Sequence, residues 1–335
     1  MPLLPAPDKL IDASGTLAFG QYRGALKDVD IADAQVAGWP GFSSGLRLKR
    51  WQHFCIVHPE LVLTLAVVHT GYLQLAWVQA IDRATGRAEE CAGRWPLVRT
   101  SVARSLWDEH NRASGSGLEV HIHNHLDQQA HRLEVATQDP GIQASLVCHH
   151  DPAETEALVV CLPVGRGRGA YSHKVPLPVS GTLEAFGRRV QLDPAECTAI
   201  LDIHQAHYPR HTWWKWATFV GRDEAGRRVA VNLTRNIVEG DAIHENALWI
   251  DGKLQLLGPA AFELEKEPWR AGTRDGGTQL VFEGGGEREE ALDLMVVVSR
   301  FRQRFGSFSG VVQAQEGPIR LDGAFGLFED HQATW

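Results

Sequence analysis

The 335-residue sequence has no uninterrupted apolar run of the ~18 to 20 residues that a transmembrane helix needs. Its most hydrophobic stretch, residues 61–68, is followed by a histidine, a threonine and a glycine. The first fifteen residues hold neither a positively charged region nor a sustained apolar segment, so no secretory signal is expected. We therefore expect a cytoplasmic protein without membrane insertion.

Cysteine is scarce, and the cysteines are not spaced as zinc ligands. The chain has five cysteines and no Cys-x-x-Cys pair: Cys55, Cys91, Cys148, Cys161 and Cys197. An odd, scattered set predicts neither a structural zinc site nor a disulfide framework, so reduced thiols are expected.

Positive charge is also in deficit. The 33 basic and 41 acidic residues give a net charge of −8, which argues against a nucleic-acid partner, because such proteins need a basic footprint. The nucleophile elbow of α/β hydrolases and the phosphate-binding P-loop are both missing. Tyrosine is rare, with 4 residues, whereas tryptophan is abundant, with 11. The length suggests about two domains.

Hydrophobic residues alternate with a period of two in several segments, which is typical of strands with two different faces. The clearest are 118–126, 228–237 and 292–298. Asp251-Gly252 between apolar runs predicts a tight hairpin. Helix signals are few: a short helix is expected at 193–197, and a weaker one near 99–110. The pattern predicts an all-β fold.

Ionisable and aromatic side chains concentrate between residues 202 and 249, and residues 203–235 carry a local charge of +4. Carboxylate, imidazole and guanidinium groups buried together can shift pKa values toward acid–base chemistry. The catalytic candidates are Asp202, His207, His244 and Glu245. The candidates for substrate binding are His204, Tyr208, Arg210, Trp214, Lys215, Trp216, Asn232, Arg235, Asn236, Asn246 and Trp249. A salt-bridged, aromatic strand pair with a purely structural role would have the same composition.

Within a strand that begins near His211, Trp214 and Trp216 should share one face, with Lys215 on the other. His121, His123 and His125 should likewise lie in a row on one strand face. Alternate imidazoles can both reach one metal ion, but a third ligand would have to come from elsewhere. A solvent-exposed polar face is the favoured interpretation, so no metal site is predicted.

Several of these segments also carry a family resemblance. The landmarks are Gly20-Gln-Tyr22-Arg23-Gly, Gly71-Tyr72-Leu73, Leu201-Asp202, Tyr208-Pro-Arg210, Trp214-Lys-Trp216, Asn232-Leu, Glu245-Asn246-Ala-Leu-Trp249, Asp251-Gly-Lys253-Leu and Gly326-Leu-Phe-Glu329-Asp330-His331. Together they resemble family 2804 of the bacterial domains of unknown function. Many relatives carry a Trp-x-Arg-Gly-like run where this chain has Ile203-His204-Gln-Ala206. The family is related to AttH and to carotenoid hydratases, also called hydroxyneurosporene synthases.

The resemblance implies two consecutive lipocalin-like antiparallel β-barrels or sandwiches of the calycin type, with few short helices. We expect an N-terminal domain at 1–185 and a C-terminal domain at 186–335 that carries the candidate site. The implied function is a cofactor-independent enzyme of the hydratase, cyclase or isomerase type that acts on a hydrophobic, isoprenoid or lipid-like molecule.

In that hypothesis Asp202 or Glu245 is the general acid, and His207 or His244 is its partner. Two alternatives remain open: a non-catalytic carrier or sensor of a lipophilic metabolite, and a motif that only clamps the domains together.

Overall fold

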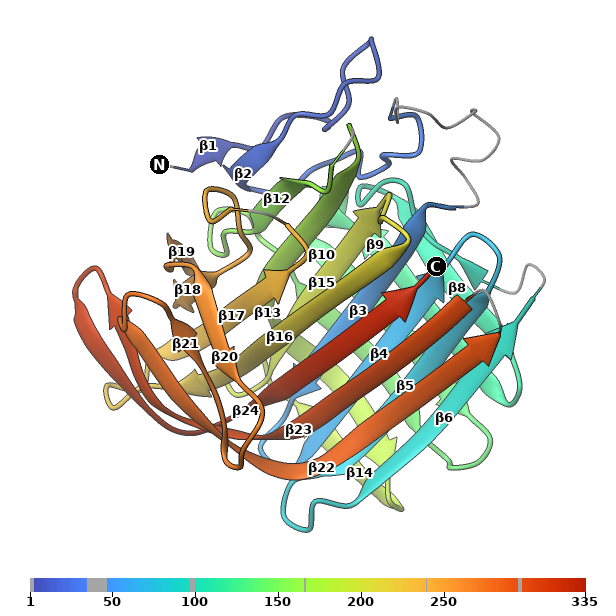
Figure 1. Ribbon diagram of the computed structural model, residues 1–335. Coiled ribbons are helices and arrows are strands. Elements are labelled where there is room, and N and C mark those ends of the chain that lie inside the picture. The colour runs from blue at the N-terminus through green and yellow to red at the C-terminus, as the bar shows by residue number, and fades with distance from the viewer. Residues whose placement is uncertain (1–2, 35–46, 97–99, 166, 239, 295–296) are drawn as a thin grey trace. The chain divides into compact units, whose positions relative to one another are not determined.

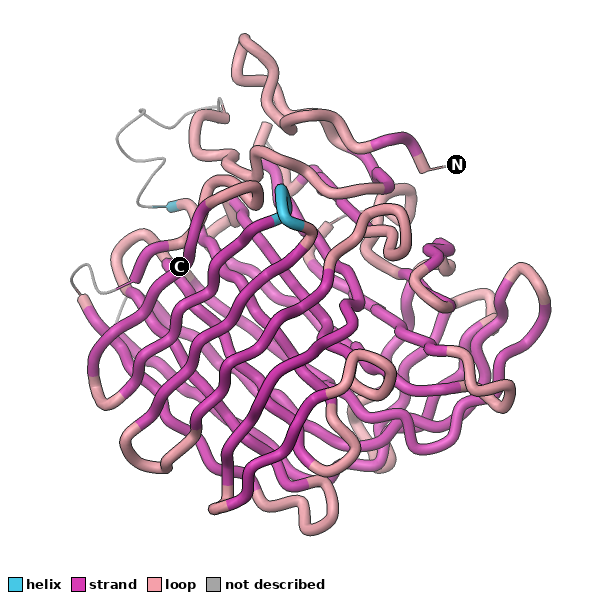
Figure 2. The backbone as a smooth tube through the Cα atoms, turned by 180° about the vertical axis from the view of Figure 1, so that it is seen from behind, coloured by secondary structure: helices cyan, strands magenta, loops and turns pink. Residues whose placement is uncertain are grey.

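The computed structural model describes residues 3–34, 47–96, 100–165, 167–238, 240–294 and 297–335 (Figure 1). Strands make up almost all of the regular secondary structure in this part of the chain and are joined by loops and turns, with a short 3-10 turn at Leu126–Gln128 (Figure 2). None of the described helical segments is long and apolar enough to cross a membrane. The chain forms two compact units, residues 1–207 and 208–335.

The strands of the first unit are short at the N-terminus and longer in the middle of the sheet. They are β1 (Leu4–Pro5), β2 (Gly20–Arg23), β3 (Lys49–Val57), β4 (Leu61–His69), β5 (Gln74–Asp82), β6 (Ala88–Trp95), β7 (Thr100–Ser101), β8 (Glu109–Gly115), β9 (Leu118–His125), β10 (Ala130–Thr137), β11 (Gln143–His149), β12 (Leu158–Pro163), β13 (Gly169–Ala185), β14 (Arg188–Leu192) and β15 (Thr198–Ala206).

These strands form one curled, mostly antiparallel sheet in the order β6-β5-β4-β3-β15-β13-β11-β10-β9-β8-β7. The long strand β13 joins its parts, because β13 pairs with β12 and β15 near its start and with β11 and β14 near its end. The sheet curls far enough for β4 to contact β7 and β8. Its inner face is an apolar core that includes Phe54, Leu65, Leu201 and Ile203.

The second unit is a single antiparallel sheet in the order β19-β18-β17-β16-β24-β23-β22-β21-β20, in which β16, β24, β23 and β22 run alongside one another (Figure 1). Its strands are β16 (His211–Arg222), β17 (Arg228–Asn236), β18 (Ala247–Ile250), β19 (Lys253–Leu256), β20 (Ala260–Glu263), β21 (Trp269–Thr273), β22 (Thr278–Leu294), β23 (Val297–Ala314) and β24 (Gly317–Thr334). One face buries an aromatic core built around Phe219, Phe282, Phe308 and Phe328.

The all-β prediction with two consecutive antiparallel β-structures is therefore confirmed. The units divide between His207 and Tyr208, later than the expected boundary after residue 185. The reason is that β15 pairs in register with both β13 and β3, which places it inside the first sheet.

Local predictions had mixed outcomes. The hairpin at Asp251-Gly252 is confirmed, because both residues have positive φ angles, 45° and 81°, as a type I′ turn requires. The helix at 193–197 is wrong: one hydrogen-bonded turn forms, and strand β15 begins at once. The weaker helix predicted near 99–110 does not form in the described residues of that range, which hold strands and bends. The alternating segment 292–298 is the end of β22 and the start of β23, which pair with each other; residues 295 and 296 lie outside the described part of the chain.

Candidate functional site

The side chains of strand β15 alternate between the apolar face and the polar face of the first sheet. Leu201 and Ile203 point into the apolar core, so the alternation places Asp202 and His204 on the opposite face. Every residue of β15 is nevertheless buried. Polar side chains in such a strand need partners, because an unsatisfied buried polar group is costly.

Asp202 finds these partners on the two neighbouring strands. Lys174, its register partner on β13, donates a hydrogen bond from Nζ to Oδ1 at 2.7 Å. The indole N–H of Trp51, on β3, donates to Oδ2 at 3.4 Å. Both carboxylate oxygens are therefore held by donors.

The environment of Asp202 determines its charge. Burial raises the pKa of this carboxyl, but the charges of Lys174 and His204 lower it, and the net pKa is below the ordinary value. Asp202 is therefore ionised at neutral pH. A group without a proton cannot be a general acid, so the acid role expected for Asp202 does not fit its surroundings.

His204 lies beside this anion and stacks on Trp51. The two ring centroids are 4.3 Å apart and the planes differ by only 8°. His53 is the register partner of Asp202 on β3 and is also buried. We call Trp51, His53, Lys174, Asp202 and His204 the first-unit cluster.

His207 does not join this cluster. It follows the end of β15, five residues beyond Asp202, which corresponds to about 16 Å along an extended chain. Burial lowers the pKa of His207 to about 4, with smaller effects from the charges of Arg50 and Asp30. The structure therefore separates two residues that we expected to act as a pair.

A chain of imidazoles crosses the interior of the first unit. His131 Nδ1 lies 2.8 Å from Asn124 Oδ1, and His131 Nε2 lies 3.0 Å from His150 Nδ1. His173 Nδ1 lies 3.0 Å from the hydroxyl of Tyr171. All five side chains are 0% exposed. Burial lowers the pKa of His150 to about 4 and that of His173 to about 3, so both are neutral at physiological pH.

The second unit has its own polar face, opposite its aromatic core. Trp214 and Trp216 share this face of β16, as predicted, because Ala217 and Phe219 point into the core. The indole N–H of Trp214 donates to Oε2 of Glu329 at 3.0 Å.

Glu329 and His331 complete that polar face from β24. Gln303 Nε2 donates to Oε1 of Glu329 at 2.5 Å. His331 packs edge-on against Trp214 with centroids 4.0 Å apart, and Ser299 Oγ lies 2.9 Å from its Nε2. Burial lowers the pKa of His331 to about 3, so the ring is neutral. We call Trp214, Ser299, Gln303, Glu329 and His331 the second-unit cluster.

Several predicted binding residues meet next to this cluster. Trp216 Nε1 donates to Asn232 Oδ1 at 2.6 Å, and Asn232 Nδ2 donates to the main-chain oxygen of Glu245 at 2.7 Å. The carboxylate of Glu245 accepts from Asn236 Nδ2 at 3.4 Å. The ring of Tyr208 stacks on Trp214, with centroids 6.0 Å apart. Trp216, Asn232, Asn236 and Glu245 are thus tied together.

Two other predicted residues support the loop before β18. The Asn246 amide accepts from the main-chain N–H of Thr234 at 2.7 Å and donates to the Gly258 carbonyl at 3.0 Å. His244 Nδ1 accepts from the Asn246 main-chain N–H at 3.3 Å, and burial lowers the His244 pKa. The side chains of Asn246 and His244 therefore hold main-chain groups of this loop in position.

The remaining predicted residues take other positions in the second unit. Lys215 and Arg235 are register partners on the opposite face of the sheet from Trp214. Arg210 is exposed, just before β16. Trp249 is buried on β18 beside Ala230, and strand alternation places it on the polar face, because Leu248 and Ile250 belong to the core.

Comparisons with known proteins agree with this architecture. The family model described as "Domain of unknown function (DUF2804)" matches residues 3–335. The chain belongs to this family. No curated protein matches this DUF2804 chain.

Solved structures share the fold at low sequence identity. CghA with Sch210972 has a TM-score of 0.54 at 11% identity and covers 97% of both chains. A protein assigned as AttH from Nitrosomonas europaea has a TM-score of 0.46 at 14% identity, over 85% of this chain and 92% of its own. Kievitone hydratase from Nectria haematococca has a TM-score of 0.46 at 12% identity, over 86% and 88%. The likeness to CghA shows a common fold.

Our sequence reasoning missed the partners of Asp202 in the first unit, and it missed Glu329 and His331 in the second unit of the DUF2804 protein. Glu329 and His331 lie in the Gly326–His331 landmark, and their even spacing was a usable signal. Lys174 and Trp51 had no local signal, because they lie 28 and 151 residues from Asp202.

In the ranges that the structure describes, no three His, Cys, Asp or Glu side chains form a metal-binding group. All five cysteines are buried thiols outside any disulfide.

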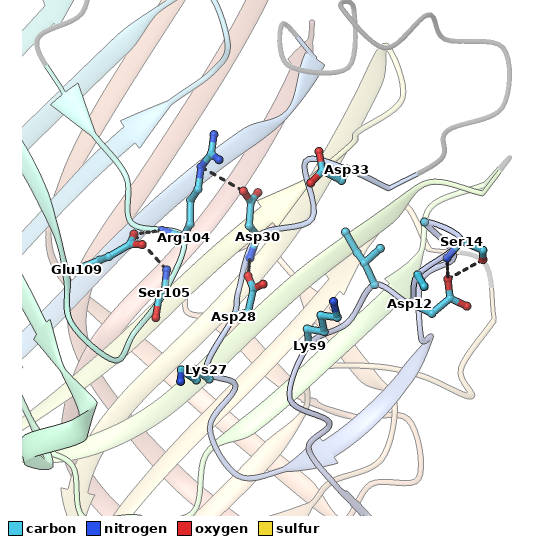
Figure 3. Close-up of a pocket in the computed structure, with 13 residues that line it drawn as sticks. Lys9, Asp12, Ser14, Lys27, Asp28, Asp30, Asp33, Arg104, Ser105 and Glu109 are labelled. Atoms are coloured by element: carbon cyan, nitrogen blue, oxygen red, sulfur yellow. Dashed lines mark hydrogen bonds and ion pairs between the residues drawn. The ribbon is translucent and has the colours of Figure 1, made fainter.

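One open pocket of about 700 Å³ lies in the first unit (Figure 3). Its lining residues come from two segments, 9–33 and 104–109. Three of the carboxylates in its lining, Asp12, Asp30 and Glu109, have partners. Asp30 pairs with Arg104 at 3.2 Å, and Glu109 accepts the main-chain N–H of Arg104 at 2.7 Å. Asp12 accepts the main-chain N–H of Ser14 at 2.8 Å. These contacts indicate a structural role.

Proposed function

We propose that this DUF2804 protein is a cofactor-independent acid–base enzyme of the hydratase, cyclase or isomerase type that acts on a hydrophobic small molecule. The observation that carries the proposal is the first-unit cluster, where the ionised Asp202 lies beside the parallel stack of Trp51 and His204. The CghA structure, which contains Sch210972, supports the fold and makes a small-molecule ligand a reasonable analogy.

His204 is the proposed proton-transfer group. A neighbouring carboxylate favours the charged imidazolium, so Asp202 would help His204 to hold a transferable proton taken from solvent. Lys174 positions that carboxylate. The face of the Trp51 indole would stabilise positive charge that develops on a substrate carbon. A positioned acid or base of this kind contributes about 10²- to 10⁴-fold in rate.

In the second unit we propose Glu245 and His244 as further ionisable groups and Trp214 and Trp216 as apolar walls. What supports this is the hydrogen-bonded set around Glu245 described above. Glu329, with two donors on its carboxylate, is a second candidate anion. The assignments of Glu245 and Glu329 can each be tested by an amide variant.

The test needs no knowledge of the substrate. Proton transfer to carbon in D₂O leaves deuterium in the product, so the purified protein is incubated in D₂O with a lipophilic extract of the producing cells. We expect at least one compound to gain deuterium, detected by mass spectrometry. His204→Phe should abolish the labelling while it keeps the stack on Trp51 and the melting temperature.

His211→Phe, at an exposed site, is the matched control and should label like the wild type. Glu245→Gln and Glu329→Gln should each slow the labelling if the second unit takes part, and an unchanged rate removes that residue from the proposal. If a compound is retained by the protein but recovered chemically unaltered, the protein is a carrier and the enzymatic proposal is overturned.

A further inference from the structure

Four histidines form an array on strands β8 and β9 of the first unit. His121, His123 and His125 alternate along β9, and His110 on β8 is the register partner of His123. The ring centroid of His123 lies 5.6 Å from that of His110, 6.3 Å from His121 and 5.9 Å from His125. His123 is therefore the centre of a continuous imidazole patch.

This patch faces away from the core. Its β9 neighbours Val120 and Ile122 belong to the apolar interior, whereas His110 is exposed and the other three rings are half-buried. Solvent and dissolved ions can therefore reach the imidazoles.

Carboxylate oxygens lie within 4 Å of the outer two rings. His121 Nε2 lies 3.8 Å from Glu119 Oε2, and His125 Nδ1 lies 3.3 Å from Asp108 Oδ1.

The central pair, His110 and His123, has its ring nitrogens available. In the described part of the chain neither side chain makes a hydrogen bond or an ion pair; their contacts are with other imidazoles. Burial and the adjacent imidazoles lower the pKa of His123, which favours the neutral ring that a metal ion requires. Arg132 is the register partner of His123 on β10, and its positive charge disfavours a bound cation nearby. The negative charge of Glu134 on the same strand offsets that repulsion.

We propose that His110 and His123 chelate a divalent d-block ion, Zn²⁺, Ni²⁺ or Cu²⁺, on the outer face of the first unit. Imidazole nitrogens suit these borderline ions. Two imidazoles bound to one tetrahedral ion at 2.0–2.1 Å have ring centres about 5 Å apart, close to the separation of His110 and His123. Water completes the coordination, because in the described part of the chain no third side chain is placed to bind the same ion.

The test is calorimetric titration of the full chain with Zn²⁺ and with Ni²⁺ at pH 7.5. We expect one saturable ion per chain in the wild type. The His110→Ala/His123→Ala double variant should bind at least about tenfold more weakly, the scale of loss typical when a metal site is damaged. Titration at pH 5 should show the same loss in the wild type, because protons compete for the imidazoles.

His149→Ala is the matched control, because His149 is exposed on the same sheet but bonded to Ser180 Oγ at 2.8 Å. It should bind metal like the wild type. The melting temperatures of all variants should stay within about 2 °C of the wild type, since exposed substitutions change stability little. Absence of saturable binding by the wild type, or undiminished binding by the double variant, would overturn the proposal.

Discussion

The ammonium of Lys174 lies 2.7 Å from Oδ1 of Asp202, and both side chains are more than 90% buried. The pair joins two adjacent strands on the face of the first sheet that carries the candidate chemistry. Two opposite charges in a buried site stabilise each other only while both are present. This dependence makes the pair a sensitive test of the site's electrostatics.

Lys174→Met should destabilise the protein by about 3–5 kcal/mol, because it leaves the Asp202 carboxylate buried without its cation. Urea unfolding of the variant and the wild type measures the loss. The double variant Lys174→Met/Asp202→Leu should recover most of it, since no buried charge remains. Equal losses in the single and double variants would contradict the charge argument and favour a packing defect.

Trp214→Phe should cost about 1–3 kcal/mol, because the Glu329 carboxylate loses the indole N–H while an aromatic ring remains in place. The same unfolding measurement applies. Trp213→Phe is the control: its side chain is 36% exposed on the other face, so a change below about 0.5 kcal/mol is expected. Similar losses in both variants would show that the Glu329 contact contributes nothing specific.

As the pH decreases, the free energy of unfolding should begin to fall at a pH well above the range in which carboxylates titrate. His150 and His173 have folded pKa values of about 4 and about 3 because they are buried, whereas the unfolded value is about 6.5. A depressed histidine pKa means that the unfolded chain binds more protons, so stability is complete above pH 6.5 and falls as the pH decreases toward 4. Each ring should cost about 2 kcal/mol between pH 7 and pH 5.

Urea unfolding at several pH values measures that slope, and His173→Gln, which removes one titrating ring, should reduce it. A stability that stays constant from pH 7 to pH 5 would contradict the neutral, buried state of these histidines.

Gly326→Ala should destabilise the second unit by about 1–3 kcal/mol, because a Cβ at residue 326 would collide with the main-chain oxygen of Thr218 and with Phe219. Thermal unfolding measures the change. Gly141→Ala is the control, since a Cβ there meets no atom within 4 Å and its φ is not positive. We expect it to be neutral or slightly stabilising. A neutral Gly326→Ala would show that β16 and β24 can separate slightly at this point.

Local alternation was sufficient to predict individual strands and their faces. It identified β9 and β17 and placed Trp214 and Trp216 together, because side-chain direction in a strand depends only on parity. The hairpin at Asp251 was predictable for a similar reason, since turn chemistry is local. The predicted helix at 193–197 failed because one capped turn is too short to continue before strand β15.

The partners of those faces were not predictable. Trp214 meets Glu329 across 115 residues of sequence, and Trp51 meets Asp202 across 151. Strand order in an antiparallel sheet depends on the burial of whole sheet faces. The residues of one strand therefore do not indicate which distant strand pairs with it.

The sequence by itself determined the all-β class, the family, the free cysteines and the segment in which acid, imidazole and indole groups gather. Only the tertiary structure decided which of those groups share a face. It placed Asp202 against Lys174, which makes the residue an ionised anchor rather than an acid. The physical reason is that composition sets which charges exist, whereas burial and neighbours across the sheet set their protonation.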